Sequence, residues 1–344
     1  MIFFTGCSIR SLIGALRKEV KMHLPKFEYL KPKTLKEASK ALAFDIKGSV
    51  LLAGGTDLLV LMKQRLLQPT RVINLKAIPG LSHISEGKDG LRIGTLTTLH
   101  DLACSPLLVE RYPALVQSAR EVGAYGHQVM GTLGGNLCQG NRCRYYNQSV
   151  FWRSARPPCH KAGGRVCYVV PKSGQCHSAY CGDIAPVLIA LGAQVVAVRP
   201  HGERTFPLEK LYSQNGKKPL ALKQGEILKE TEIPSSAGKT LYLKWRLRDS
   251  IEFPILSLAL NLDKNGEGKI KRTRIVFSGV EPGPVEASEA EKLLKGAALS
   301  DPLIEKVSHW VTKEISPMRT STVSPAYKRK MAGILLKQAL ERVM

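Results

Sequence analysis

Two glycine-rich turns constrain this chain more than any other feature of its sequence. Their residues are Leu51, Leu52, Ala53, Gly54, Gly55, Thr56, Asp57 and Leu58 in the first turn, and Thr132, Leu133, Gly134, Gly135 and Asn136 in the second. Glycine lets the backbone approach a ligand closely, and a helix that begins at the turn adds the positive end of its dipole. Because the G-x-G-x-x-G fingerprint of a Rossmann domain is absent, we expect these turns to hold a diphosphate cofactor in another fold.

A group of four cysteines follows directly after the second turn. They are Cys143, Cys159, Cys167 and Cys176, all between residues 139 and 181. Their spacing differs from the C-x-x-C pairs of zinc ribbons. Four thiolates suit an iron–sulfur cube, in which each iron takes one thiolate, and they also suit zinc. These residues alone leave a cluster, a zinc ion and unliganded thiols open. Cys138 and Cys181 flank the segment, and we assign them to small apolar packing.

Length and composition place the chain among globular proteins. It has 344 residues, of which 44% are hydrophobic, and this is enough to bury a sizeable core in two or three domains. No apolar run is long enough to span a membrane, so we expect no membrane partner. Residues 1–21 lack the apolar segment and cleavage site of a secretion signal, and we interpret them as an N-terminal extension or the product of a misplaced start codon. Eight cysteines without such a signal favour reduced thiols and a cytoplasmic location.

The net charge of +23 is high, with 51 Lys and Arg against 28 Asp and Glu. Such a balance is typical of nucleic-acid-binding proteins. However, the sequence contains no nucleic-acid-binding motif, its aromatic content is only 6%, and its positive charges are spread along the chain. We therefore expect no nucleic-acid partner and interpret the charge as a solvated basic surface. A docking face for an acidic protein is the alternative.

The hydrophobic periodicity predicts an α+β protein. We expect helices at residues 36–43, 57–64, 99–104, 112–122, 184–191, 287–294, 303–314 and 326–343, and strands at 49–52, 71–75, 91–94, 194–198, 226–233, 240–246, 253–262 and 269–277. Helices recur after a run of strands, and this pattern favours a separate C-terminal domain from about residue 239.

A series of motifs resembles the FAD-binding medium subunits of molybdenum hydroxylases, the family of carbon monoxide dehydrogenase and xanthine dehydrogenase. The motifs are residues 24–29 (LPKFEY), 53–57 (AGGTD), 93–98 (IGTLTT), 132–136 (TLGGN) and 182–186 (GDIAP), then Lys244 with Phe253 and Pro254, and residues 278–280 with Pro284. The resemblance implies a two-subdomain, PCMH-type FAD-binding fold over residues 22–238. It also implies a CO dehydrogenase flavoprotein-like C-terminal domain over residues 239–344.

The resemblance also implies a set of cofactor-binding residues and no catalytic residue. Residues 51–58 would form the first flavin loop and residues 132–136 the second, with Val122 beside the flavin. Asp183 would bind the polyol chain of the cofactor, Leu228 would contact the ring region, and Lys244 would place a positive charge near the ring. An N-cap of the following helix is the structural alternative for Asp183, and a surface lysine is the alternative for Lys244. No tethering histidine follows the first glycines, so we expect the FAD to be non-covalent.

The cysteine segment resembles an insertion in the flavoprotein subunits of 4-hydroxybenzoyl-CoA reductases. Asn136 and Asp183 lie 47 positions apart, far more than in other members of the family. The match includes residues 142–148 (RCRYYNQ) and the pair Trp152 and Arg153. This resemblance implies that an insertion at about residues 139–181 binds a [4Fe–4S] cluster through Cys143, Cys159, Cys167 and Cys176.

The implied function is electron transfer within an enzyme complex. A small [2Fe–2S] subunit and a large molybdopterin subunit would be the partners, and ferredoxin would supply electrons for reduction of an aromatic acyl-CoA. The first alternative is the FAD subunit of a xanthine, aldehyde or CO dehydrogenase-like hydroxylase with an accessory cluster. The second is a non-catalytic binding protein in which the cysteines hold zinc.

Overall fold

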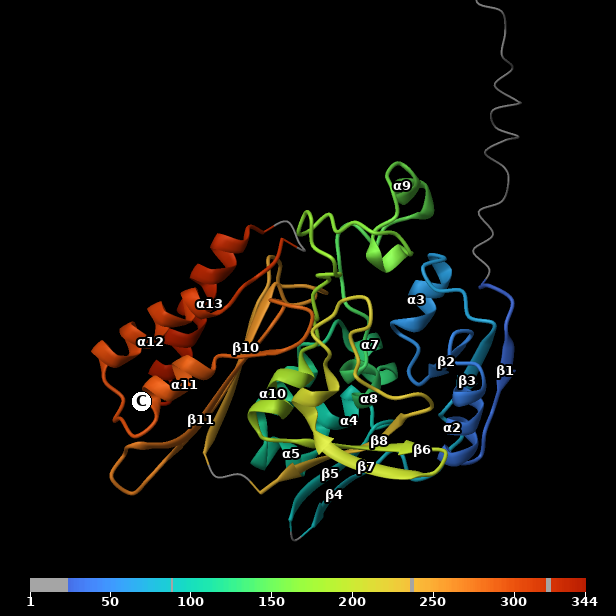
Figure 1. Ribbon diagram of the computed structural model, residues 1–344. Coiled ribbons are helices and arrows are strands. Elements are labelled where there is room, and N and C mark those ends of the chain that lie inside the picture. The colour runs from blue at the N-terminus through green and yellow to red at the C-terminus, as the bar shows by residue number, and fades with distance from the viewer. Residues whose placement is uncertain (1–23, 88, 236–237, 320–322) are drawn as a thin grey trace, which may run out of the picture.

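The computed structural model describes residues 24–87, 89–235, 238–319 and 323–344. The expected N-terminal extension and Cys7 lie outside these ranges. Figure 1 shows a small blue sheet at one side, a central block of strands and green helices, and an orange and red block at the other side. In the described part of the chain, no helix is both long enough and apolar enough to cross a bilayer.

The first block is a three-stranded parallel sheet with one covering helix. The strands lie in the order β1 (Glu28–Leu30), β3 (Arg71–Asn74) and β2 (Ser49–Leu52), and the helix is α2 (Leu35–Phe44). Thr34 caps α2 by accepting a hydrogen bond from the N–H of Glu37 at 3.2 Å. The first glycine turn leaves the C-terminal end of β2 and leads into α3 (Leu58–Lys63). The turn therefore lies where parallel strands place ligands, outside their carboxyl ends.

The central block contains a five-stranded antiparallel sheet. Its strands lie in the order β4 (Ile84–Gly87), β5 (Gly90–Gly94), β8 (Ile227–Pro234), β6 (Gln194–Arg199) and β7 (Gly202–Pro207). The helices of this block are α4 (Leu99–Cys104), α5 (Pro106–Arg111), α6 (Pro113–Arg120), α7 (Tyr125–Met130), α8 (Leu133–Leu137) and α10 (Ile184–Ala190). Every residue of α10 is buried, and this helix contributes to the largest hydrophobic core.

The C-terminal block is a four-stranded antiparallel sheet between two layers of helices. Its strands lie in the order β12 (Val285–Glu286), β11 (Ile270–Ser278), β10 (Leu256–Lys264) and β9 (Lys239–Trp245), and its helices are α11 (Ser288–Leu294), α12 (Asp301–Glu314) and α13 (Pro325–Glu341). Residues 256–262 of β10 are all buried. A strand with one solvated face would alternate, so both faces of this sheet are covered, by α11–α13 on one side and by the central block on the other.

The insertion after α8 has little regular structure. It contains the short helix α9 (Val150–Ser154), a single 3₁₀ turn over His160–Ala162, and isolated bridges that join Arg142 to Ala179 and Cys159 to Val166. Figure 1 shows it as a green lobe that stands above the central block, with α9 at its tip.

The α+β prediction is confirmed, and the expected helices and strands are present with small shifts at their ends. The second glycine turn is itself the helix α8, and α5, α7, α9, β4 and β7 were not expected. These are short elements, and periodicity gives a weak signal over so few residues.

Candidate functional site

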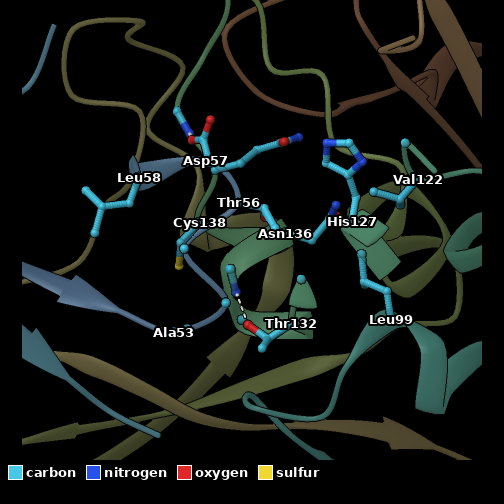
Figure 2. Close-up of a pocket in the computed structure, with 18 of the residues that line it drawn as sticks. Ala53, Thr56, Asp57, Leu58, Leu99, Val122, His127, Thr132, Asn136 and Cys138 are labelled. Carbon is cyan, nitrogen blue, oxygen red and sulfur yellow. Dashed lines mark hydrogen bonds between the residues drawn. The ribbon is translucent and has the colours of Figure 1, made fainter. Parts of the chain in front are cut away.

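Both glycine turns line one cavity of about 550 Å³ between the blue sheet and the central block. This volume lies in the range of cofactor and ligand pockets. Figure 2 shows Thr56 and Asp57 of the first turn and Thr132 and Asn136 of the second around the same space. The cavity therefore joins the two motifs that the sequence analysis singled out.

The first turn presents free backbone donors to this cavity. In the part of the chain that the structure describes, the N–H groups of Gly54, Gly55 and Thr56 have no acceptor in the protein. A Cβ atom on Gly54 would lie 1.9 Å from the carbonyl oxygen of Met130, and Gly55 has a φ of +77°. Glycine is needed at both positions, one for close approach and the other for its conformation. Consecutive free N–H groups form a concave site for anions.

The second turn is built differently, because the N–H groups of both its glycines are already used. Gly134 N–H donates to the carbonyl of Thr95 at 2.8 Å, and Gly135 N–H donates to Thr132 Oγ1 at 3.1 Å. The latter bond, drawn as a dashed line in Figure 2, is the N-cap of α8. We expected both turns to offer backbone amides to a diphosphate. In the structure, free glycine N–H groups occur in the first turn, whereas the glycine N–H groups of the second turn are bonded within the protein.

Asp183 lies on the cavity wall and forms a buried polar group with two residues of β9. The hydroxyl of Tyr242 donates to Asp183 Oδ1 at 2.6 Å, and Lys244 Nζ lies 3.0 Å from the same oxygen. Lys244 also donates to the carbonyl of Glu121 at 2.7 Å. Burial raises the pKa of Asp183 to about 6, and the positive charge of Lys244 opposes this rise.

The structure bears on two structural alternatives: an N-cap role for Asp183 and a surface position for Lys244. Asp183 stands at the N-cap position of α10 but makes no capping bond there. Asn136 Oδ1 instead accepts a hydrogen bond from the N–H of Ile184, at 3.3 Å. Lys244 is not a surface lysine, because its side chain is fully buried. It does not line the cavity and stands behind Asp183.

Most of the other expected residues lie on the cavity wall. Val122 and Leu228 line it, whereas Leu52 and Leu133 do not, and Leu133 is fully buried in the central core. Wall residues that the sequence analysis did not assign to the site include Thr95, His127, Cys138, Gln139, Gly140, Arg142 and residues 251–253. Thr95 belongs to a recognised motif, and residues 138–142 directly follow the second turn, so their positions could have suggested the assignment.

The four cysteines of the insertion line a second, smaller cavity. Cys143, Cys159, Cys167 and Cys176 all contribute to its wall, together with Tyr145, Tyr146, Lys161 and Tyr168. The thiol of Cys143 accepts hydrogen bonds from two backbone N–H groups, and burial raises its pKa. The N–H of Val170 donates to Cys167 Sγ at 3.5 Å. Thus four cysteines that are far apart in the chain line the same small cavity.

The geometry around these thiols is not that of a formed metal site. Among the residues that the structure describes, no three Cys, His, Asp or Glu side chains meet in an arrangement that could hold a metal ion. The donor set nevertheless suits an iron–sulfur cluster, because four thiols, N–H donors to sulfur and a nearby lysine are its usual surroundings.

Cys138 and Cys181 lie apart from these thiols and are buried. Cys138 lines the larger cavity, and burial raises its pKa to about 12. Burial raises the pKa of Cys181 to about 11. Thiols with such values stay protonated near neutral pH, as expected for residues that only pack.

Comparison with known proteins identifies the family. The family described as "FAD binding domain in molybdopterin dehydrogenase" matches residues 25–236, and the "CO dehydrogenase flavoprotein C-terminal domain" matches residues 242–343. The chain belongs to this family, the FAD-binding subunits of molybdenum hydroxylase-type oxidoreductases, and the recognition of the family and the fold from the sequence is confirmed.

Three relatives illustrate the similarity. The aldehyde oxidoreductase FAD-binding subunit PaoB of Escherichia coli is 33% identical over 80% of this chain and 89% of its own length. The glyceraldehyde dehydrogenase medium chain of Sulfolobus acidocaldarius is 25% identical over 94% and 100%. A solved structure of carbon monoxide dehydrogenase from Hydrogenophaga pseudoflava has a TM-score of 0.77 at 26% identity, covering 93% of this chain and 98% of the other.

The larger cavity fits the FAD that this family binds. Its first turn has free N–H donors, and two further nitrogen atoms on its wall, Gln139 Nε2 and Arg142 Nε, are buried without a partner among the described residues. A bound polar ligand would satisfy such groups. Because the chain is a flavin-binding oxidoreductase subunit, the alternative of a non-catalytic binding protein is wrong.

Proposed function

We propose that this chain is an electron-transfer subunit with two redox groups, FAD in the larger cavity and a [4Fe–4S] cluster on Cys143, Cys159, Cys167 and Cys176. One observation carries the proposal. Arg142 lines the larger cavity, and the next residue, Cys143, lines the cysteine cavity. The two sites are therefore neighbours along the chain as well as in space, as a relay between redox groups requires.

The flavin, when bound, exchanges one or two electrons, and the protein supplies its binding and its electrostatic surroundings. In our proposal, the free N–H groups of Gly54, Gly55 and Thr56 bind the diphosphate. Asp183 accepts a hydrogen bond from the polyol chain, and the buried charge of Lys244 fixes that carboxylate. Val122 and Leu228 exclude water from the ring region.

The cluster, when bound, exchanges one electron, and the insertion compensates its negative charge. Residues 139–181 contain seven Lys or Arg and no Asp or Glu. Lys161 lines the cysteine cavity and donates to the carbonyl of Asn141 at 2.7 Å. Backbone N–H groups donate to the sulfur atoms of Cys143 and Cys167. Hydrogen bonds and charge of this kind stabilise and tune iron–sulfur clusters.

The partners that we propose are a small [2Fe–2S] subunit and a large molybdopterin subunit, where the substrate would react. The names of the relatives support a complex, because they are called medium chains, medium subunits or FAD-binding subunits. We further propose that an acidic ferredoxin meets this chain at the insertion. The exclusively positive charge of residues 139–181 supports it, as does Phe151 of α9, whose side chain is 89% exposed.

The reaction that we favour is a reduction like that of 4-hydroxybenzoyl-CoA reductase, and the insertion is the feature that supports it. A second candidate is a xanthine, aldehyde or CO dehydrogenase-like hydroxylase, in which the cluster is an accessory. The names of the relatives favour this second candidate, since they act on aldehydes, carbon monoxide, nicotine and xanthine.

Anaerobic purification of the chain with its partners tests both levels of the proposal. We expect one FAD that acid precipitation releases into the supernatant, and about four iron and four sulfide per chain beyond those of the small subunit. Zinc in place of iron, or flavin that stays in the pellet, would contradict the assignment. Reduction of 4-hydroxybenzoyl-CoA by reduced ferredoxin supports the first candidate, whereas dye-linked oxidation of aldehydes, xanthine or carbon monoxide supports the second.

A further inference from the structure

We infer that Arg142 is a positioning residue that couples the flavin cavity to the cysteine insertion, so that binding at one site orders the other. The inference rests on the proposed FAD site. It does not depend on what the cysteines hold.

The carboxylate of Asp57 holds the start of the insertion with both of its oxygen atoms. Oδ1 forms an ion pair with the guanidinium of Arg142, and Oδ2 accepts a hydrogen bond from the N–H of Gly140 at 3.1 Å. The insertion has no Asp or Glu of its own, so the acidic partner of Arg142 comes from the first turn. It also follows the free N–H groups of the first turn directly. Any movement of that turn is therefore transmitted to Arg142.

Arg142 in turn joins three segments that are distant in sequence. Its backbone exchanges two hydrogen bonds with Ala179, at 2.7 and 2.9 Å, so it fastens the beginning of the insertion to its end. Its guanidinium lies 4.8 Å from the centre of the Phe253 ring, which belongs to the C-terminal block and also lines the cavity. Among the described residues, Asp57 is the acidic side chain that pairs with this half-buried cation. The insertion contains no Asp or Glu that could take its place.

A second contact ties the same two regions together. The hydroxyl of Tyr146, on the wall of the cysteine cavity, donates to the carbonyl of Leu66 at 3.2 Å. Leu66 lies just after α3, the helix that the first turn begins. The insertion thus contacts the chain on both sides of α3, at Asp57 just before it and at Leu66 just after it. Because the insertion has almost no regular structure of its own, its order depends on such contacts.

Ligand binding at the first turn should therefore stabilise the insertion, and by linkage an ordered insertion should strengthen ligand binding. Before FAD binds, several N–H groups of the turn have no partner in the protein. Once they are satisfied, the turn and Asp57 have fewer alternative conformations. Couplings between linked sites are about 5- to 150-fold, and we expect the lower part of this range because Asp57 and Arg142 are both partly exposed.

Hydrogen exchange, followed by mass spectrometry on the full chain with saturating FAD and after flavin removal, tests the inference. In the natural protein we expect FAD to slow exchange in peptides from residues 139–181 by about 10-fold. In Asp57→Asn and Arg142→Gln, each saturated with FAD, this protection should fall below about 2-fold, and Arg142→Lys should restore part of it. The affinity for FAD, measured by fluorescence, should fall by about 5- to 10-fold in each variant.

Two controls separate coupling from a general loss of structure. Arg165→Gln removes an exposed arginine of the same insertion and should keep the full protection. The Asp57→Asn/Arg142→Gln double variant should lose less FAD affinity than the two single losses added together, since the ion pair between the two residues is lost in all three variants. Equal FAD-dependent protection in the natural protein and the variants, or no protection in the natural protein, would overturn the inference. Failure of FAD to bind to the natural protein would instead overturn the proposed function.

Discussion

The flavin cavity and the cysteine cavity are neighbours, but the protein builds them in different ways. Much of the wall of the flavin cavity comes from elements that are anchored in hydrophobic cores, and Gly54 of the first turn meets the backbone of Met130, at the end of α7 just before the second turn. The cysteine cavity lies in a lobe with one five-residue helix, one 3₁₀ turn and isolated bridges. The comparison indicates that the fold alone forms the first site. We propose that the order of the second depends on a bound group, as it commonly does for metal sites in small lobes.

The interactions inside the two regions differ accordingly. Around the flavin cavity, buried polar groups are paired closely, as in Asp183 with Tyr242 and Lys244. In the insertion, arginine side chains lie over aromatic rings, and Arg156 is within 6 Å of the ring centres of Tyr145, Trp152 and Tyr168. Cation–π contacts of this kind contribute little each at exposed sites. These contacts of the insertion are therefore individually weak.

We expect the largest effect when the contact between Gly54 and the Met130 carbonyl is disturbed. Gly54→Ala places a methyl group where the Met130 carbonyl lies, and neither backbone can yield cheaply. Overpacking costs about 1–3 kcal/mol, so we expect FAD affinity to fall by up to about 100-fold in a fluorescence titration of flavin-free protein. Gly126→Ala is the matched control, since nothing lies within 4 Å of its added Cβ. A folded Gly54→Ala protein with unchanged affinity would show that the turn is not preformed.

Substitution of the cysteines tests the proposal that the insertion holds an iron–sulfur cluster. Cys143→Ser should lower iron and sulfide from about four per chain to near zero after anaerobic purification, because a cube needs one thiolate for each iron. Cys138→Ser should keep the iron, since that thiol lines the other cavity. The exposed Cys104 provides a further control as Cys104→Ser. The reverse pattern, with iron lost from the Cys138 variant and kept in the Cys143 variant, would exchange the roles of the two regions.

The close pairing at the flavin cavity predicts a pH dependence of stability. The pKa of Asp183 is about 6 in the folded protein, above its ordinary value near 3.8. Because the folded value is the higher one, the contribution of this group is full below about pH 4 and is lost as the pH rises through about 6. Asp183→Asn cannot ionise. We therefore expect the free energy of unfolding of Asp183→Asn, relative to that of the natural protein, to rise by ~3 kcal/mol between pH 4 and pH 7.

Urea unfolding of both proteins at each pH measures this difference. Asp249→Asn is the control, since the Asp249 side chain is 94% exposed. A difference that stays constant would mean that Lys244 offsets the cost of burying the ionised carboxylate in full. One that moves in favour of the natural protein would mean that Lys244 stabilises this carboxylate by more than burial destabilises it.

The smallest expected effect concerns the charge of the insertion. Arg156→Glu combined with Arg165→Glu reverses two exposed charges there. Electrostatic steering changes association rates by about 10-fold or more and weakens with salt. We expect stopped-flow reduction by an acidic ferredoxin to slow by about 10-fold at low ionic strength and little at high ionic strength, with dithionite reduction unchanged. Arg272→Glu, on the C-terminal sheet, should leave the rate as it is. Equal slowing by both changes would mean that the insertion has no special part in the encounter.

The sequence by itself determined the family, the α+β class, and most of the elements that carry the site. Local signals suffice for these features. The glycines of the first turn are needed for close approach and a positive φ, and long amphipathic helices such as α12 and α13 have clear periodicity. The cysteines were also recognisable as a group from their position after the second turn.

Only the tertiary structure decided how these parts work together. Periodicity cannot show that the carbonyl of Thr95 takes the N–H of Gly134 in the second turn, because that bond joins distant segments. Nor can it show that Lys244 stands behind Asp183, or that Asp57 reaches across to Arg142. Burial, pairing and shared walls are properties of residues that are far apart in the chain, and the packing of the whole fold sets them.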